Sequence, residues 1–86
     1  MLSKAQVEQL RRHRGADRNR LAKAMDLASV TQVQIATGTG FTQSFVSKVQ
    51  NGQYSDLPGE TMRTFASFFG CAIEDLFPAR REAVAS

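Results

Sequence analysis

The sequence predicts an all-α domain of five helices, and three observations support this prediction. Apolar residues recur at spacings of three and four in several short segments, which is the periodicity of a helix that buries one face. Glycines and an Asn-Gly pair fall between these segments, and the chain has only 2 prolines. No stretch of useful length alternates apolar and polar residues as a half-buried strand does. With 86 residues, the chain suffices for one small domain and not for two.

The first two helical segments lie on either side of Gly15. The segment 2–13 begins with a capping box, since Ser3 is followed three residues later by Gln6. We expect the first helix of the domain either to extend through Gly15 or to break there. Four apolar residues share one face of the next segment, 17–28: Leu21, Ala24, Met25 and Ala28.

A shorter helix follows, opened by a second capping box. Thr31 precedes Gln34 by three residues, and we expect Gly38 and Gly40 to close the helix.

The remaining helices are also bounded by recognisable residues. Thr42 can cap a helix that stops at residues 51–52, and Pro58 stands where a first helical turn tolerates proline. Gly70 ends the helix after Pro58, and Pro78 ends a last short helix over residues 73–77. The expected buried residues are Val46 and Val49 in the first of these helices and Met62, Phe65, Ala66 and Phe69 in the second.

The segment 32–51 carries the strongest functional signal. Its two helices are joined by a tight link at residues 39–41, where Gly40 can adopt a left-handed conformation that a side chain would penalise. Ala36 is small where the helices would cross, and Ile35 can fill the space between them together with the two valines. This pattern indicates a helix-turn-helix, whose second helix enters the major groove of DNA.

The residues of this segment resemble the lambda-repressor-like (Cro/phage-repressor, XRE-type) helix-turn-helix family. The resemblance covers about residues 17–78, and the Gln43-Ser44 pair with Asn51-Gly52 beyond it is especially similar to lambda-type phage repressors. It implies a compact five-helix DNA-binding domain over 17–78 with the helix-turn-helix at 32–51. Residues 1–16 would form a basic amino-terminal helical extension and 79–86 a flexible tail. The matching residues are Thr31, Gln32, Ile35, Ala36, Gly40, Phe41, Gln43, Ser44, Val46, Ser47, Val49, Asn51, Gly52, Phe65, Ala66, Phe69, Gly70 and 74–78.

Two departures from the family pattern stand in this segment and just before it. Many members have an Arg at the position of Met25 and a Glu at that of Gln50, and these form an ion pair beneath the recognition helix. Replacing both charged residues leaves no unpaired buried charge, so we interpret Met25 and Gln50 together as a compensated core. Phe45 replaces a small or polar residue. It could pack inward, touch a thymine methyl group or contact another chain.

The resemblance and the outward face of the helix 42–51 predict the same DNA contacts. The predicted base-contacting residues are Gln43, Ser44, Ser47 and Lys48, because Gln can bond two atoms of adenine and Ser can donate or accept at a base edge. Lys48 could bond guanine or a phosphate. The predicted phosphate-contacting residues are Gln32, Thr42, Asn51, Gln53, Tyr54, Arg18 and Arg20.

Positive charge is concentrated at the amino-terminal end. The net charge is +3, from 11 basic and 8 acidic residues, which favours a polyanionic partner. Five of the ten residues over 11–20 are arginine. This cluster could clamp the DNA backbone or reach into a narrow minor groove, and it could equally be a solvated helix surface.

The resulting functional hypothesis is a Cro-like repressor of phage or prophage type. It would bind double-stranded DNA at an inverted-repeat operator as a homodimer, with half-sites about 34 Å apart. Two alternatives involve a protein partner: an antitoxin that binds a toxin and represses its own operon, and a protein-binding adaptor on the same fold. Phe45, Phe68 and Phe77 are the apolar side chains considered for a partner or a dimer interface.

The sequence predicts no enzymatic activity, no cofactor and no metal site. His13 has no second His beside it and no metal-ligand spacing to Cys71, which we expect to be a packed thiol. Glu74 and Asp75 are expected to favour the start of the last helix. No run approaches the roughly 18 apolar residues of a membrane span, and the single Cys fits a reducing compartment. We therefore expect a cytoplasmic protein that joins the nucleoid when bound to DNA.

Overall fold

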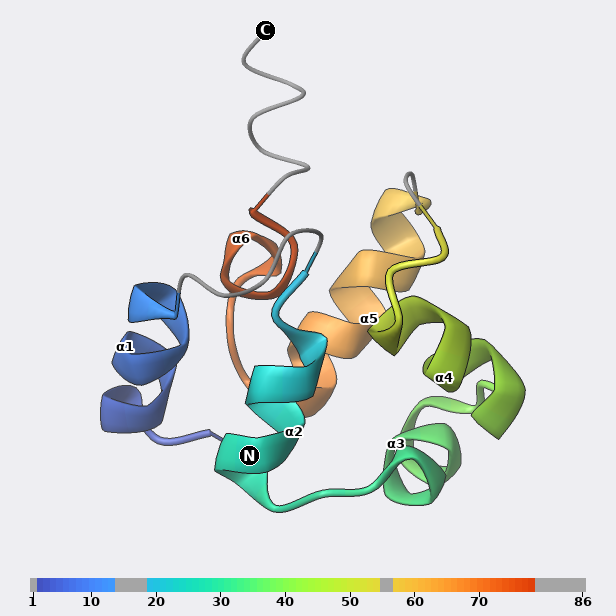
Figure 1. Ribbon diagram of the computed structural model, residues 1–86, viewed down its shortest axis with the longest axis horizontal. Coiled ribbons are helices and arrows are strands. Elements are labelled where there is room, and N and C mark those ends of the chain that lie inside the picture. The colour runs from blue at the N-terminus through green and yellow to red at the C-terminus, as the bar shows by residue number, and fades with distance from the viewer. Residues whose placement is uncertain (1, 14–18, 55–56, 79–86) are drawn as a thin grey trace, which may run out of the picture.

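The computed structural model describes residues 2–13, 19–54 and 57–78, and these residues form six helices and no strand (Figure 1). The prediction of an all-α fold is therefore confirmed. Gly15 lies outside the described residues, and the segments on either side of it form separate helices. The helices are α1 (Lys4–Arg12), α2 (Leu21–Ala28), α3 (Gln32–Thr39), α4 (Gln43–Gln50), α5 (Gly59–Phe69) and α6 (Ile73–Leu76).

Helix α1 begins at the predicted capping box. The Ser3 hydroxyl accepts the Gln6 backbone N–H at 3.2 Å, and the Gln6 side-chain oxygen accepts the Ser3 backbone N–H at 2.9 Å. Leu10 is fully buried, and the Leu2 backbone N–H donates to the Phe69 carbonyl at 2.9 Å. The amino-terminal helix thus shares the core of the rest of the molecule.

Helix α2 begins at Leu21, later than the predicted start at residue 17. Residues 19 and 20 are not helical, and each makes a hydrogen bond outside the helical pattern. The Arg20 backbone N–H donates to the Leu76 carbonyl at 2.7 Å, and the Asn19 side-chain oxygen accepts the Leu21 N–H at 2.9 Å. A contact with α6 thus decides where α2 starts, and the local sequence pattern does not contain that contact.

Helix α3 continues through Gly38, so the prediction that this glycine closes the helix is wrong. The Thr31–Gln34 capping box forms as predicted, and the helix ends at Gly40, whose φ of 84° lies in the left-handed region. A Cβ atom on Gly38 would lie 2.5 Å from Cε1 of Phe68. Gly38 therefore permits α5 to approach α3 closely and does not terminate the helix.

The last three helices match the prediction within about one residue. The Thr42 hydroxyl accepts the Phe45 N–H at 3.1 Å and caps α4, which ends at Asn51. Helix α5 follows Pro58 and ends at Gly70, whose φ is 74°. The predicted tail over residues 79–86 lies outside the described residues.

The core lies between the helices and is largely aliphatic and aromatic. Phe65 and Phe69, predicted to be interior, are fully buried. Phe77 is only 5% exposed, and its ring centroid lies 6.2 Å from that of Phe65. Phe77 is thus a core residue, and its suggested use at a dimer or partner interface is wrong. The other large, fully buried side chains are Leu10, Leu21, Ile35, Val46, Val49 and Leu76.

Candidate nucleic-acid interface

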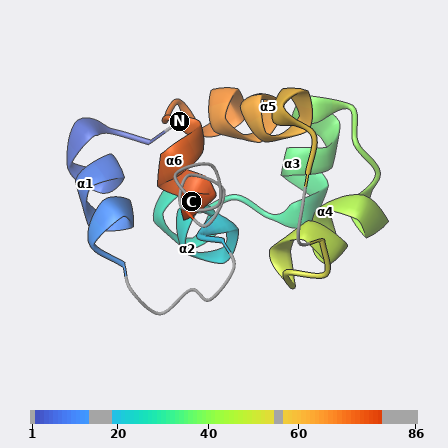
Figure 2. The same cartoon turned by 90° about the horizontal axis from the view of Figure 1, so that it is seen from above.

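Helices α3 and α4 form a compact unit at one end of the molecule, on the right in Figures 1 and 2. Ile35, Val46 and Val49 are at most 1% exposed. The prediction that these three residues are interior is therefore confirmed. The turn is held by the left-handed Gly40 and by the Thr39 hydroxyl, which accepts the Phe41 N–H at 3.2 Å.

The predicted base-contacting residues lie on the outer side of α4. Gln43, Ser44 and Lys48 are exposed, and Ser47 is half-buried. The buried Val46 and Val49 lie on the other side of the helix, as its period of 3.6 residues per turn requires. The exposed amide, hydroxyl and ammonium groups can donate hydrogen bonds to base edges or to phosphate oxygens.

The predicted phosphate-contacting residues lie at the ends of the two helices and in the loop after α4. Gln32 begins α3 and is half-buried, and Thr42 caps α4, where backbone N–H groups give the helix start positive potential. Asn51 is exposed at the end of α4. Gln53 and Tyr54 follow it and are exposed, and Arg18 lies outside the described residues.

A family model described as Cro/C1-type HTH DNA-binding domain matches residues 7–79. The chain belongs to this family. Neither the curated proteins nor the solved structures compared with the chain include a significant match. Among the described residues, no helix is both long and apolar enough to cross a membrane.

The position of the family's buried ion pair is occupied by neutral side chains in this Cro/C1-type domain. Met25 packs against the core. The half-buried Gln50 accepts a hydrogen bond from Nε2 of Gln32, which joins the first residue of α3 to the last residue of α4. The polar group of Gln50 is thereby satisfied without a charge, in agreement with the interpretation as a compensated core.

Phe45 packs against other aromatic side chains of the domain, in agreement with the first of the three alternatives. Its ring centroid lies 5.1 Å from that of Phe41, 6.3 Å from that of Phe65 and 5.4 Å from that of Tyr54. Such aromatic contacts stabilise beyond the area they bury. The half-buried Phe45 therefore connects α4 to α5 and to the loop after α4, and Tyr54 is held against it.

The sequence analysis did not predict the contact between Asn19 and α4. Its side-chain nitrogen donates to the Val49 carbonyl near the end of α4 at 2.8 Å, although the two residues are 30 positions apart. An Asn two residues before the first apolar residue of a helix is a signal for a local turn. That signal predicts the bond to Leu21 and gives no indication of the bond to α4.

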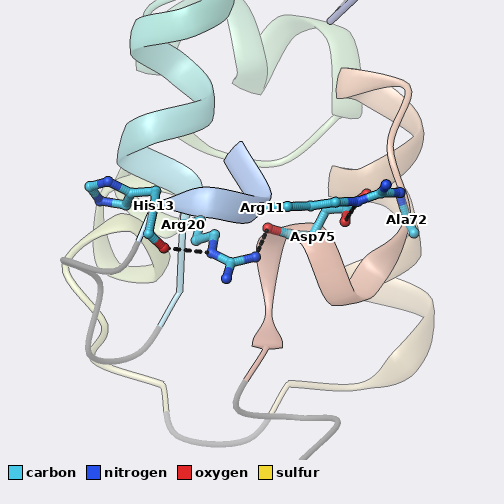
Figure 3. A network of polar contacts seen from close by, with 5 residues as sticks. All are labelled: Arg11, His13, Arg20, Ala72 and Asp75. Atoms are coloured by element: carbon cyan, nitrogen blue, oxygen red, sulfur yellow. Dashed lines mark hydrogen bonds and ion pairs between the residues drawn. The ribbon is translucent and has the colours of Figure 1, made fainter. Parts of the chain in front are cut away.

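Part of the arginine cluster binds the protein itself (Figure 3). Nε of Arg11 donates to Oδ1 of Asp75 at 2.7 Å, and this hydrogen bond, with the carboxylate charge, raises the pKa of Arg11. The guanidinium of Arg20 donates to the carbonyls of His13 at 3.2 Å and Asp75 at 3.3 Å. Arg20 is thus directed toward α1 and α6, and the structure does not bring its guanidinium to α4.

The exposed arginines of α1 lie far from the helix-turn-helix. In both views α1 stands at the end of the molecule opposite α3 and α4 (Figures 1 and 2). Nη2 of Arg12 lies 3.8 Å from Oε2 of Glu8 within the same helix. For α1, a surface helix held by Arg11 fits the structure better than a clamp on the DNA backbone beside α4.

Cys71 and Asp75 lie beside this network. Burial, and after it the charge of Asp75, raise the pKa of the half-buried Cys71 thiol to about 11, although the charge of Arg11 opposes the shift. Asp75 accepts the Ala72 N–H at 3.0 Å and so supports the start of α6. Among the described residues, His, Cys, Asp and Glu form no group of three that could hold a metal ion.

Proposed function

We propose that this Cro/C1-type domain is a sequence-specific transcriptional repressor that inserts α4 into the major groove of DNA. The observation that carries the proposal is the division of α4 into two faces. Val46 and Val49 are buried, whereas Gln43, Ser44 and Lys48 are exposed for base contacts. A polar face of this kind, on the second helix of a helix-turn-helix, suits direct readout.

The proposed phosphate contacts are mainly neutral. Gln32, Thr42, Asn51, Gln53 and Tyr54 would position the domain through hydrogen bonds, and they carry no sequence information. Lys48 is the one charged side chain among the proposed contacts within the described residues of α3, α4 and the loop after α4, residues 32–54. Electrostatic attraction through this surface is therefore small, and base contacts must supply much of the affinity.

The proposed binding unit is a homodimer on an inverted repeat, because one domain contacts too few base pairs for high specificity. The two α4 helices would then reach half-sites about one helical turn, roughly 34 Å, apart. Repression would follow from occupying a promoter, and the protein would act in the cytoplasm at the nucleoid.

The three phenylalanines considered for a protein partner make contacts within the domain. Phe45 packs against other aromatic rings, Phe77 is buried, and Phe68 is half-buried against Gly38 and Phe69. These contacts favour the DNA-binding proposal over the antitoxin alternative. The adaptor alternative was motivated by the sparse charge of α4, and the duplex titration below tests it.

The test is selection from a pool of random duplexes, followed by titration of the enriched duplex and a scrambled duplex of equal composition. We expect an inverted repeat to be enriched. The variant Gln43→Ala/Ser44→Ala should lose about tenfold or more of the preference for that duplex, since a good base contact contributes about 1–3 kcal/mol of discrimination. Weak, salt-sensitive binding to both duplexes should remain.

A matched control removes the same residue types away from α4. Gln9 of α1 and Ser67 of α5 are both exposed, so Gln9→Ala/Ser67→Ala should keep the preference of the unchanged protein. If the α4 variant also keeps full preference, the assignment of α4 as the reading helix is wrong. If no duplex is enriched and none binds at low salt, the adaptor alternative replaces the proposal.

A further inference from the structure

The carboxyl-terminal turn of α4 is held at two points by neutral amide groups. Nδ2 of Asn19 donates to the Val49 carbonyl at 2.8 Å, and Gln32 bonds to the side chain of Gln50. The Val49 carbonyl also accepts the Gly52 N–H at 3.0 Å, so Asn19 occupies its second acceptor position. The last carbonyls of a helix lack partners within the helix, which makes this end free to be bound from outside.

The other end of the Asn19 amide is fixed to the core. Its oxygen accepts the N–H of Leu21, a fully buried residue at the start of α2. The adjacent Arg20 N–H donates to the Leu76 carbonyl at 2.7 Å, so the backbone beside Asn19 is also fixed to α6. Because an amide is planar, its donor and acceptor cannot move independently. One side chain therefore links the end of α4 to the start of α2.

The position of that end affects how α4 presents its outer face. The helix has 8 residues, so a displacement at Val49 tilts the whole helix and moves Gln43 and Ser44 with it. Hydrogen bonds to base edges require groups held within about 0.5 Å of their productive position. An α4 that rocks would lose discrimination between bases before it loses general attraction to DNA.

We propose that Asn19 is a positioning residue for DNA sequence recognition: it needs no DNA contact of its own and acts by holding α4 in place. This proposal rests on the function proposed above. It adds a residue outside the helix-turn-helix to those that set the sequence preference.

The principal variant is Asn19→Asp, which has the same shape. The aspartate can still accept the Leu21 N–H, but it places a carboxylate oxygen where the donor faced the Val49 carbonyl. We expect the ratio of Kd for the scrambled duplex to Kd for the enriched duplex to fall about tenfold. A second variant separates this effect from repulsion between the added carboxylate and the phosphates. Asn19→Ala, which adds no charge, should show the same fall.

The matched control is Ser3→Ala. Ser3 caps α1, at the opposite end of the molecule from α4 (Figure 1). Loss of such a cap costs about 0.5–2 kcal/mol of stability. We expect Ser3→Ala to leave the Kd ratio unchanged at a temperature where all variants are folded. A merely structural role for Asn19 predicts that its variants behave like this control.

Hydrogen exchange of the free protein supplies a second readout that needs no DNA preference. The Asn51 N–H donates to Ser47 and the Gln53 N–H donates to Lys48, and both should exchange about tenfold faster in Asn19→Asp. The Gly70 N–H at the end of α5 should change much less, and Ser3→Ala should not single out α4.

The two readouts separate failure of this proposal from failure of the proposed function. If the unchanged protein enriches a duplex and both Asn19 variants keep the Kd ratio within twofold, Asn19 is not a positioning residue. Unchanged exchange at Asn51 and Gln53 would overturn the proposal even if no duplex is enriched. If no duplex is enriched but exchange is faster, the DNA-reading function is refuted, and with it the role of Asn19 in sequence recognition. Asn19 would then only stabilise the end of α4.

Discussion

Gly38 offers a sharp test of how α3 and α5 pack, because an added methyl group meets the ring of Phe68. In Gly38→Ala the new Cβ would lie 2.5 Å from Cε1 and 2.9 Å from Cδ1 of that ring. Ordinary carbon–carbon contacts are about 3.5–4.0 Å, so the ring must move by about 1 Å. The same ring makes an edge contact with Phe69, whose centroid is 5.1 Å away, and this contact must readjust when the ring moves.

Two opposing effects decide the sign of the change in stability at Gly38. Overpacking of this kind costs about 1–3 kcal/mol. Alanine in a helix interior is favoured over glycine by about 0.5–1 kcal/mol. The net expectation is a loss of about 1 kcal/mol, which lowers Tm by about 4–8 °C in a domain of this size.

The assay is a double-mutant cycle followed by thermal and urea denaturation. In a Phe68→Ala background the overlap is gone, and Gly38→Ala should stabilise by about 0.5–1 kcal/mol through helix propensity alone. The coupling energy is then about 2 kcal/mol. Gly59→Ala is the control, because nothing lies within 4 Å of a Cβ at that helical glycine, and it should not destabilise.

The reasoning about Gly38 is refuted by either of two results. Gly38→Ala could raise Tm in the unchanged background, which would mean that the Phe68 ring moves aside without cost. The effect of Gly38→Ala could also be equal in the two backgrounds, which would mean that the two residues are not coupled.

Four further predictions concern single residues. Gly40→Ala should destabilise by about 1 kcal/mol through the φ of 84° alone, since nothing lies within 4 Å of an added Cβ atom. Gly40→Asn should lose less stability in urea denaturation, because Asn tolerates the left-handed region better, and equal losses would contradict this. Phe45→Ala should cost about 2 kcal/mol by the same measurement, less than a fully buried Phe, and a neutral result would show that the aromatic contacts are unimportant. Lys48→Ala should reduce the slope of log K against log salt by about 1 per chain if Lys48 binds phosphate, whereas an unchanged slope with altered base preference would assign it to guanine. The pKa of Cys71 is raised from an ordinary 9.0 to about 11, which lowers its thiolate fraction near neutral pH about a hundredfold. Iodoacetamide should therefore react with Cys71 far faster after unfolding, and equal rates in the folded and unfolded protein would show that the pKa is not shifted.

Local signals in the sequence were sufficient for most helix boundaries and for the division of α4 into two faces. Ser3, Thr31 and Thr42 each cap a helix as predicted, because capping depends on residues only three positions apart. Val46 and Val49 could be placed inside because a helix has a fixed period. The positions of Gln43, Ser44 and Lys48 on the outer side follow from the same period.

The tertiary structure alone decided contacts between residues distant in the chain. Gly38 resembles a helix stop in the sequence, and only the approach of Phe68 shows that it is a packing residue. The arginines over 11–20 resemble a DNA clamp, and only the carboxylate and carbonyl of Asp75 show that Arg11 and Arg20 bind the protein. The bond from Asn19 to Val49 spans 30 positions. Periodicity and capping report on neighbours within about one helical turn, whereas these contacts depend on how whole helices pack, which determines the partner that each polar side chain meets.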